Sequence, residues 1–234
     1  MLIFTLFISV LVKVTLGAVT CSVDPLEVCR EPTLFNRIPL SAEEFSELCP
    51  NVLEYVRCYR EYDESCSDNE TNYFYDEEYE SIHDLLIELC NPGSLIHKVV
   101  AENLKCLNET FSDTLCVEES ETVLVPYKEF LQEGSNSEDF KLPPRIYCLR
   151  DILDGTCIIN DISMKCPPAV KIASVEILRR SYYVQESCSI EHAKELLDEM
   201  DDFKLKDKTK DYVTEVLRKL VETESFIPFF SILL

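Results

Sequence analysis

Residues 47–66 read ELCPNVLEYVRCYREYDESC, with cysteines at positions 49, 58 and 66 in a stretch that otherwise favours a helix. Ser41-Ala42-Glu43-Glu44, just upstream, is a capping box. In it the Ser41 side chain accepts a hydrogen bond from the Glu44 amide, and the Glu44 side chain reaches back. Pro50 interrupts the pattern, so the helix kinks there or begins again with Pro50 as its first residue. Apolar residues at helical spacing follow the capping box: Phe45, Leu48, Val52 and Val56.

Three cysteines on one helix cannot all bridge one another. Residues eight apart on a straight helix are separated by about 12 Å along the axis, whereas a disulfide needs Cα atoms within about 7 Å. Cys58 and Cys66 therefore do not pair if one helix carries both, and Cys49 and Cys58 pair only if Pro50 folds the chain back. We expect Cys58 to reach another element, with Cys106 as a candidate partner. The disulfides then act as cross-braces between helices, and their connectivity stays open because twelve cysteines allow about 10,000 pairings.

The rest of the chain also favours helices over strands. Glycine occurs only 4 times, and alternating β-branched runs bounded by turn residues are almost absent. Asn91-Pro92-Gly93 is a helix stop followed by a turn. We therefore predict an all-α, disulfide-braced helical bundle with apolar helical stripes over residues 82–89, 96–111, 168–178, 190–200 and 213–220.

The first seventeen residues, MLIFTLFISVLVKVTLG, have the composition of a secretory signal peptide cleaved after about Gly17. The alternative is an N-terminal membrane anchor, but the apolar run is shorter than the ~20 residues that a span needs. An even number of cysteines behind a leader indicates an oxidised extracellular framework. Metal sites are disfavoured because no CxxC occurs and the histidines are far from any cysteine pair. The predicted disulfide cysteines are Cys21, Cys29, Cys49, Cys58, Cys66, Cys90, Cys106, Cys116, Cys148, Cys157, Cys166 and Cys188.

Two sequons and a strong acidic excess agree with secretion. Asn69 and Asn108 each begin an N-x-[ST] sequence. The chain has 22 basic and 44 acidic residues, a net charge of −22. This charge argues against nucleic acid, heparin-like polymers and anionic membranes as partners. High solubility is the simplest role for it, and a dedicated cationic partner is the alternative.

Cysteine spacing and loop signals suggest that the chain contains two related helical subdomains. We predict a signal peptide at 1–17, helical subdomains at 18–132 and 144–224, a linker at 133–143 and an apolar tail at 225–234. The gaps within Cys49, Cys58, Cys66 and Cys90 resemble those within Cys148, Cys157, Cys166 and Cys188, which hints at a duplication. On that reading Cys106 and Cys116 lack counterparts near 205 and 215.

A resemblance to a known family rests on residues 49–116. Residues 47–66 and the stretch DLLIELCNPGSLIHKVVAENLKCLNETFSDTLC, 84–116, are similar to arthropod secreted cysteine-rich proteins typified by the 27 kDa haemolymph glycoprotein. They are also similar to related six-cysteine secreted domains of nematodes and arachnids. The carried features are C-x8-C-x7-C and C-x15-C-x9-C. The resemblance implies a secreted, helical, disulfide-linked glycoprotein, and it brings no catalytic residues.

Catalytic motifs are weak or missing. The chain has no G-x-S-x-G, P-loop or H-E-x-x-H sequence. His83-Asp84 is similar to the His-Asp pair of secreted phospholipases A2, but it lacks their flanking cysteines and Gly-rich calcium loop. We therefore expect a protein that is not an enzyme and needs no cofactor or metal.

Residues 59–84 are acidic and rich in tyrosine. A solvated loop between helices is the simplest interpretation. The sharper hypotheses are sulfation of Tyr75 and Tyr79, which would create a patch for a basic partner, and weak calcium binding. The tail 225–234, SFIPFFSILL, is expected to pack in a groove of the core, with partner binding or self-association as the alternative.

Two functions remain open from sequence. The first is a non-enzymatic extracellular protein that binds a macromolecular partner. The second is a carrier that holds a lipid or another small hydrophobic ligand between its helices. The close C-x3-C pair of insect odorant-binding proteins is absent, so that carrier family is disfavoured.

Overall fold

A computed structural model describes residues 21, 23–32, 37–66, 74–133, 141–185, 187–201, 205 and 207–223. Within these residues the secondary structure is helical and contains no strand, so the all-α prediction is confirmed. The predicted leader 1–17, the sequon at Asn69, most of the 133–143 linker and the tail 225–234 lie outside the described residues.

Each predicted stripe lies on a helix, but the helices over 116–133 and 145–165 had no predicted stripe. The stripe over 96–111 is divided at Asn103, whose side chain donates to the Val99 carbonyl at 2.8 Å. The helices are α2 (Pro25–Val28), α3 (Ala42–Ser65), α4 (Asp76–Leu89), α5 (Leu95–Glu102), α6 (Leu104–Asp113), α7 (Cys116–Glu133), α8 (Arg145–Lys165), α9 (Pro168–Arg180), α10 (Ile190–Glu199) and α11 (Asp207–Thr223).

Helix α3 is continuous through Pro50, so of the two predicted alternatives, a kink or a restart, the restart does not occur. Ser41 caps it as predicted, accepting from the Glu44 amide at 3.2 Å. The Glu44 carboxylate does not reach back to Ser41. It accepts instead from the Leu40 amide at 2.9 Å and pairs with Arg37 at 3.0 Å, so the cap extends one residue further upstream.

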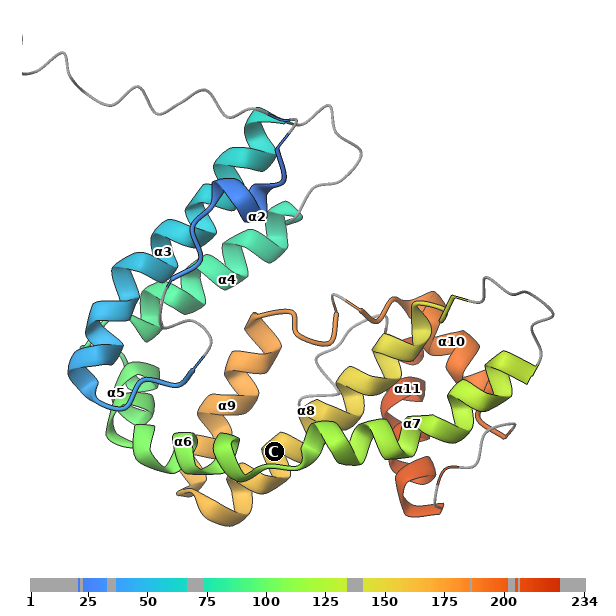
Figure 1. Cartoon of the computed structure of the whole chain (residues 1–234). Helices are drawn as coiled ribbons and strands as arrows, with labels where there is room; N and C mark the ends of the chain where they lie inside the picture. The colour runs from blue at the N-terminus through green and yellow to red at the C-terminus, as the bar shows by residue number, and fades with distance from the viewer. Residues whose placement is uncertain are drawn as a thin grey trace, which may run out of the picture.

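The helices form a projecting hairpin and a larger body (Figure 1). Helices α3 and α4 pack side by side and extend away from the rest, with α5 and α6 at the turn between the two parts. Helix α8 runs through the body and contacts α6, α7, α9, α10 and α11. Helix α9 packs on α4, α5 and α8, and so joins the hairpin to the body.

One large core and one smaller cluster lie inside this arrangement. The large core extends from Phe45 through α5 and α6 into α8, where Leu149 and Ile152 have no exposed surface. The smaller cluster joins Leu85, Ile96 and Ala173, which come from α4, α5 and α9. The predicted α11 stripe is buried in the large core.

Six disulfides join all twelve cysteines, and none is free. As geometry required, Cys58 bridges neither Cys49 nor Cys66. Cys106, the candidate partner of Cys58, is wrong, because the segment before α3 returns along that helix and brings Cys29 to Cys58. The pairs are Cys21–Cys66, Cys29–Cys58, Cys49–Cys90, Cys106–Cys166, Cys116–Cys157 and Cys148–Cys188.

The pairing reveals two six-cysteine modules with one connectivity. In the first module, Cys21 to Cys90, the cysteines pair first to fifth, second to fourth and third to sixth. The second module, Cys106 to Cys188, repeats this order. Six cysteines allow 15 connectivities, so a shared one supports duplication of a single unit.

The modules explain why Cys106 and Cys116 have no counterparts further along the chain. They open the second module and correspond to Cys21 and Cys29. Their disulfides run to Cys166 and Cys157 and therefore join residues on the two sides of the predicted 133–143 linker. The covalent modules divide the chain between Cys90 and Cys106 instead.

Candidate functional site

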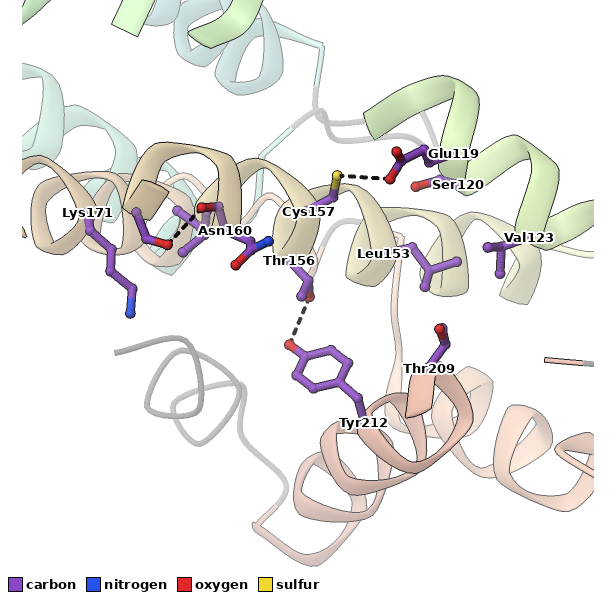
Figure 2. Close-up of a pocket in the computed structure, with 12 residues that line it drawn as sticks. Glu119, Ser120, Val123, Leu153, Thr156, Cys157, Asn160, Lys171, Thr209 and Tyr212 are labelled. Atoms are coloured by element: carbon purple, nitrogen blue, oxygen red, sulfur yellow. Dashed lines mark hydrogen bonds between the residues drawn. The ribbon is translucent and has the colours of Figure 1, made fainter. Parts of the chain in front are cut away.

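A cleft of about 750 Å³ lies between α7 and α8 of the second module and α11, which follows that module (Figure 2). This volume falls within the roughly 300–1,000 Å³ of small-molecule sites. Its lining mixes apolar side chains with hydroxyl, amide and charged groups. The lining residues on α7 and α8 are Glu119, Ser120, Val123, Leu153, Thr156, Cys157, Ile159, Asn160 and Ser163, joined by Lys171, Thr209 and Tyr212.

Hydroxyl groups of Thr156 and Tyr212 meet across the middle of the cleft at 2.8 Å (Figure 2). Thr156 donates its own proton to the Ile152 carbonyl at 2.7 Å. The Tyr212 hydroxyl is therefore the donor to Thr156, since each hydroxyl has one proton. Burial raises the pKa of Tyr212, which keeps the phenol neutral. This bond fixes α11 to α8 beside the cleft.

Both ends of the cleft carry polar groups (Figure 2). Lys171 and Asn160 lie toward one end, and Leu153 and Val123 lie toward the other together with Glu119, Ser120 and Thr209. Glu119 extends from α7 and its carboxylate lies 3.9 Å from the Cys157 sulfur. Cys157 is in a disulfide and has no proton to donate, so this is a contact and not a hydrogen bond.

A buried carboxylate lies on α8 near the cleft. Asp154 is 6% exposed, and its Oδ1 has no hydrogen-bond partner. Burial raises the pKa of Asp154, opposed by a hydrogen bond from Ser120, which itself lines the cleft. Asp154 is therefore a carboxyl group that resists ionisation, and its hydrogen bond to Ser120 places it next to the wall of the cleft.

A second candidate surface lies on the α3–α4 hairpin. Its rings form a chain of contacts: Tyr55 to Tyr59 at 5.0 Å, Tyr59 to Phe74 at 6.1 Å, and Phe74 to Tyr79 at 6.3 Å between centroids. The Arg60 guanidinium lies 5.2 Å from the centre of the Tyr79 ring. We call this chain, with the exposed acids Asp76, Glu77 and Glu80 of α4, the acidic aromatic face.

The structure separates the two predicted sulfation residues. Tyr75 is 77% exposed at the start of α4, directly before the exposed acids Asp76 and Glu77. Tyr79 is half-buried, stacks on His83 at 5.5 Å, and has a pKa raised chiefly by burial. The geometry favours Tyr75 as the acceptor, and sulfation stays a prediction.

The remaining predicted residues fall at separate places. Asn108 lies half-buried on α6, where its side-chain oxygen accepts from Ser112 at 3.4 Å, and its glycosylation stays a prediction. His83 stacks on Tyr79. The described part of the chain contains no group of three residues suited to hold a metal ion. Among the described helices, none has the length and apolarity to cross a bilayer.

Sequence reasoning missed the cleft. Its walls come from helices that are far apart in the chain, and Thr156 and Tyr212 are separated by 56 residues. The one sequence signal near it was the α11 stripe, which marks the buried face of that helix and not the face toward the cleft.

The fold and disulfides define an all-α, disulfide-braced protein built from two six-cysteine modules. Comparisons with family models, with curated proteins and with solved structures found no match.

Proposed function

We propose that the chain is a secreted, non-enzymatic extracellular glycoprotein of haemolymph-glycoprotein type that binds a macromolecular partner through the α3–α4 hairpin. The observation that carries this proposal is the acidic aromatic face on a hairpin held by three disulfides. Rigid aromatic side chains supply contact area at low entropic cost, and a rim of one charge sign selects partners of the opposite sign.

The hairpin is suited to this role because of its position and stiffness. It projects from the body (Figure 1). The acids Asp76, Glu77 and Glu80 are exposed there, Tyr79 is half-buried, and Tyr59 is buried beneath them as a support. Disulfides join α3 to the preceding segment at Cys58 and Cys66, and to the end of α4 at Cys49. A surface that is already ordered loses little conformational entropy on binding.

The charge of the face indicates a basic partner. Arg60 pairs with Asp76 at 2.6 Å and with Glu64 at 2.8 Å, so its charge is neutralised within the face. Glu77 and Glu80 are exposed on the same helix. The remaining field is negative and would attract an arginine- or lysine-rich segment of an extracellular protein.

Calorimetric titration of the secreted protein with a decapeptide of alternating arginine and tyrosine tests this proposal. The triple variant Asp76→Asn, Glu77→Gln, Glu80→Gln should weaken binding at least tenfold at physiological salt. A control variant with the same charge change outside the face, Glu191→Gln, Asp198→Asn, Asp211→Asn, should weaken it less than threefold. Equal weakening by both variants would show a response to net charge alone and would reject the face as the site.

The cleft supports carriage of a small ligand as a second candidate function. Its volume of about 750 Å³ and mixed lining suit an amphipathic molecule. Organic extraction of natively purified protein followed by mass spectrometry tests this function. One small molecule per chain would support a carrier, and extracts without a stoichiometric compound would reject it.

A further inference from the structure

A hollow of about 200 Å³ lies where the α3–α4 hairpin meets the end of α9. The Ser81 hydroxyl on α4 donates to the Arg180 carbonyl at 3.0 Å, which holds the two elements together there. The residues that line the hollow are Tyr55, Val56, Tyr59, Phe74, Glu78, Ile82 and Ser181. The hollow therefore combines three aromatic rings, apolar side chains and one carboxylate in a small space.

The rings around the hollow are held in fixed positions. The Tyr55 and Tyr59 hydroxyls are hydrogen-bonded at 3.1 Å, and their ring planes are inclined at 73°. The Phe74 ring is inclined at 71° to that of Tyr59. Tyr59 is 5% exposed, whereas Tyr55 and Phe74 are partly exposed. A ligand in the hollow would meet rings that are already ordered, so little conformational entropy would be lost on binding.

Packing of the hydrophobic cores does not require this hollow. In the described part of the chain, none of the three rings belongs to the large core or to the smaller cluster. The spacing between the third and fourth cysteines is the same in both modules, so Val56 corresponds to Gly155. A Cβ atom at Gly155 would lie 3.7 Å from the Tyr183 ring. The second module therefore fills this position with a ring of its own, and the first module leaves a hollow beside Val56.

We propose that the hollow binds a small organic cation with a methylated ammonium group, such as choline. The face of an aromatic ring is electrically negative and attracts a cation within about 6 Å of the ring centre, more strongly where water is excluded. The neighbouring Tyr79 ring already has a cation in this position, since the Arg60 guanidinium lies 5.2 Å from its centre. The inference concerns a small ligand and does not rest on the macromolecular partner proposed above.

Hydration favours a methylated cation over a primary ammonium. Val56 and Ile82 line the hollow with side chains that accept no hydrogen bond. A primary ammonium would lose bound water there without full replacement, whereas a quaternary ammonium has no N–H group to satisfy. The Glu78 carboxylate supplies the opposite charge. It accepts from the Tyr75 amide at 3.4 Å, and this neutral donor does not cancel its charge.

The charges around the hollow disfavour a ligand that also carries an anion. Asp76, Glu77 and Glu80 are exposed on α4. The Arg60 guanidinium near the rings pairs with Asp76 at 2.6 Å and with Glu64 at 2.8 Å. A phosphate next to the ammonium group would therefore be repelled. We expect the hollow to prefer choline to phosphocholine.

Titration calorimetry of the purified full chain with choline and with 3,3-dimethyl-1-butanol tests the inference. The two molecules have the same shape, and in the alcohol a carbon atom replaces the charged nitrogen. Choline should bind at one site per chain and about tenfold more tightly than the alcohol, because the alcohol lacks the attraction between the cation and the rings. Phosphocholine should bind more weakly than choline.

Substitutions locate the site. Tyr55→Leu removes a ring and should weaken choline binding about fivefold, while Tyr55→Phe keeps the ring and should retain most of the affinity. Tyr147→Leu removes an exposed ring on α8 outside the hollow and should leave the affinity unchanged. Glu78→Gln keeps an acceptor for the Tyr75 amide and should weaken choline about threefold, whereas Glu80→Gln, outside the hollow, should weaken it less than about twofold. Circular dichroism checks that each variant is folded, and Phe74→Leu replaces Tyr55→Leu if the latter does not fold.

Three results would overturn the inference. They are the absence of saturable choline binding, equal affinity for choline and the neutral alcohol, and equal weakening by Tyr55→Leu and Tyr147→Leu. The macromolecular proposal fails separately. If the decapeptide of arginine and tyrosine does not bind but choline shows the expected preferences, the macromolecular partner is rejected and the organic-cation site stands.

Discussion

Asp154 is the residue at which burial and charge conflict most directly. It faces the Ser120 hydroxyl, and the charged groups that act on it are Arg150, Asp151 and Glu121. Burial and two acids raise the pKa of Asp154, while Ser120 and Arg150 lower it, and the net direction is upward. Because the pKa of Asp154 is raised in the folded state, its protonated form favours folding. This contribution to the free energy of unfolding is fully present below the unfolded pKa of about 4, and it is lost as the pH rises through the folded-state pKa.

Asp154→Asn should therefore stabilise the protein at neutral pH. The amide removes the buried charge and keeps an acceptor for Ser120, so we expect a gain of about 1 kcal/mol, or roughly 2–4 °C in Tm. The gain should disappear near pH 3, where Asp154 is protonated in the wild type. Thermal unfolding followed by circular dichroism at both pH values measures this, and the exposed Asp198→Asn is the control. A gain of equal size at both pH values would contradict the argument.

Tyr75 and Tyr79 differ in access, which sharpens the sulfation prediction. A sulfotransferase must reach the phenol oxygen, and Tyr75 is 77% exposed whereas Tyr79 is half-buried against His83. Peptide mass spectrometry of the purified protein should find an added mass of about 80 Da on Tyr75 and none on Tyr79. A sulfate would add acceptor oxygens and negative charge, much as a phosphate does. Tyr75→Phe should remove the added mass, and unmodified Tyr75 would refute the prediction.

At the scale of elements, the positions of some helices were predictable, whereas α7, α8, the break within the 96–111 stripe and the packing between helices were not. The stripes on α4, α9, α10 and α11 follow from apolar spacing, because each buries one face. The break at Asn103 was missed because the stripe passes through it without a change of spacing. The cleft was missed because its walls depend on how α7, α8 and α11 pack, which spacing within one helix does not encode.

A polar network of Arg145 joins three helices and should contribute strongly to stability. Arg145 on α8 makes a bidentate pair with Glu199 on α10 at 2.7 and 2.9 Å and donates to Tyr127 on α7 at 3.0 Å. Tyr127 has no exposed surface, and its hydroxyl also donates to Glu199. Removing Arg145 leaves the half-buried Glu199 without its cation, and the loss of charge-assisted hydrogen bonds costs about 2 kcal/mol.

Arg145→Met should therefore lower Tm by several degrees. The exposed ion pairs of Arg57 provide a control. Arg57 pairs with Glu54 and Glu61 at the surface, and exposed pairs contribute roughly 0–1 kcal/mol. We expect Arg57→Met to change the free energy of unfolding by less than about 1 kcal/mol in urea titrations. Similar losses in the two variants would mean that the Arg145 network is not a major support of the body.

At the scale of the whole molecule, duplication was visible in part of the cysteine spacing but its boundaries were not. The similar gaps within Cys49–Cys66 and Cys148–Cys166 indicated a repeat. The spacing of Cys21 and Cys29 before the third cysteine differs from that of Cys106 and Cys116, because α7 is much longer than α2. That insertion hid the correspondence, which only the shared connectivity reveals.

The two modules should be covalently separate, and peptide mapping measures this directly. Digestion without reduction should yield disulfide-linked peptides only within residues 21–90 and within 106–188. Each disulfide closes a loop of 29 to 60 residues, which corresponds to about 4 kcal/mol of unfolded-state restriction. A rearranged pairing would have to place cysteines of both modules within bonding distance, although the hairpin projects away from the body. A peptide that links Cys58 to Cys106 would refute the modular arrangement, and with it the duplication inferred from the shared connectivity.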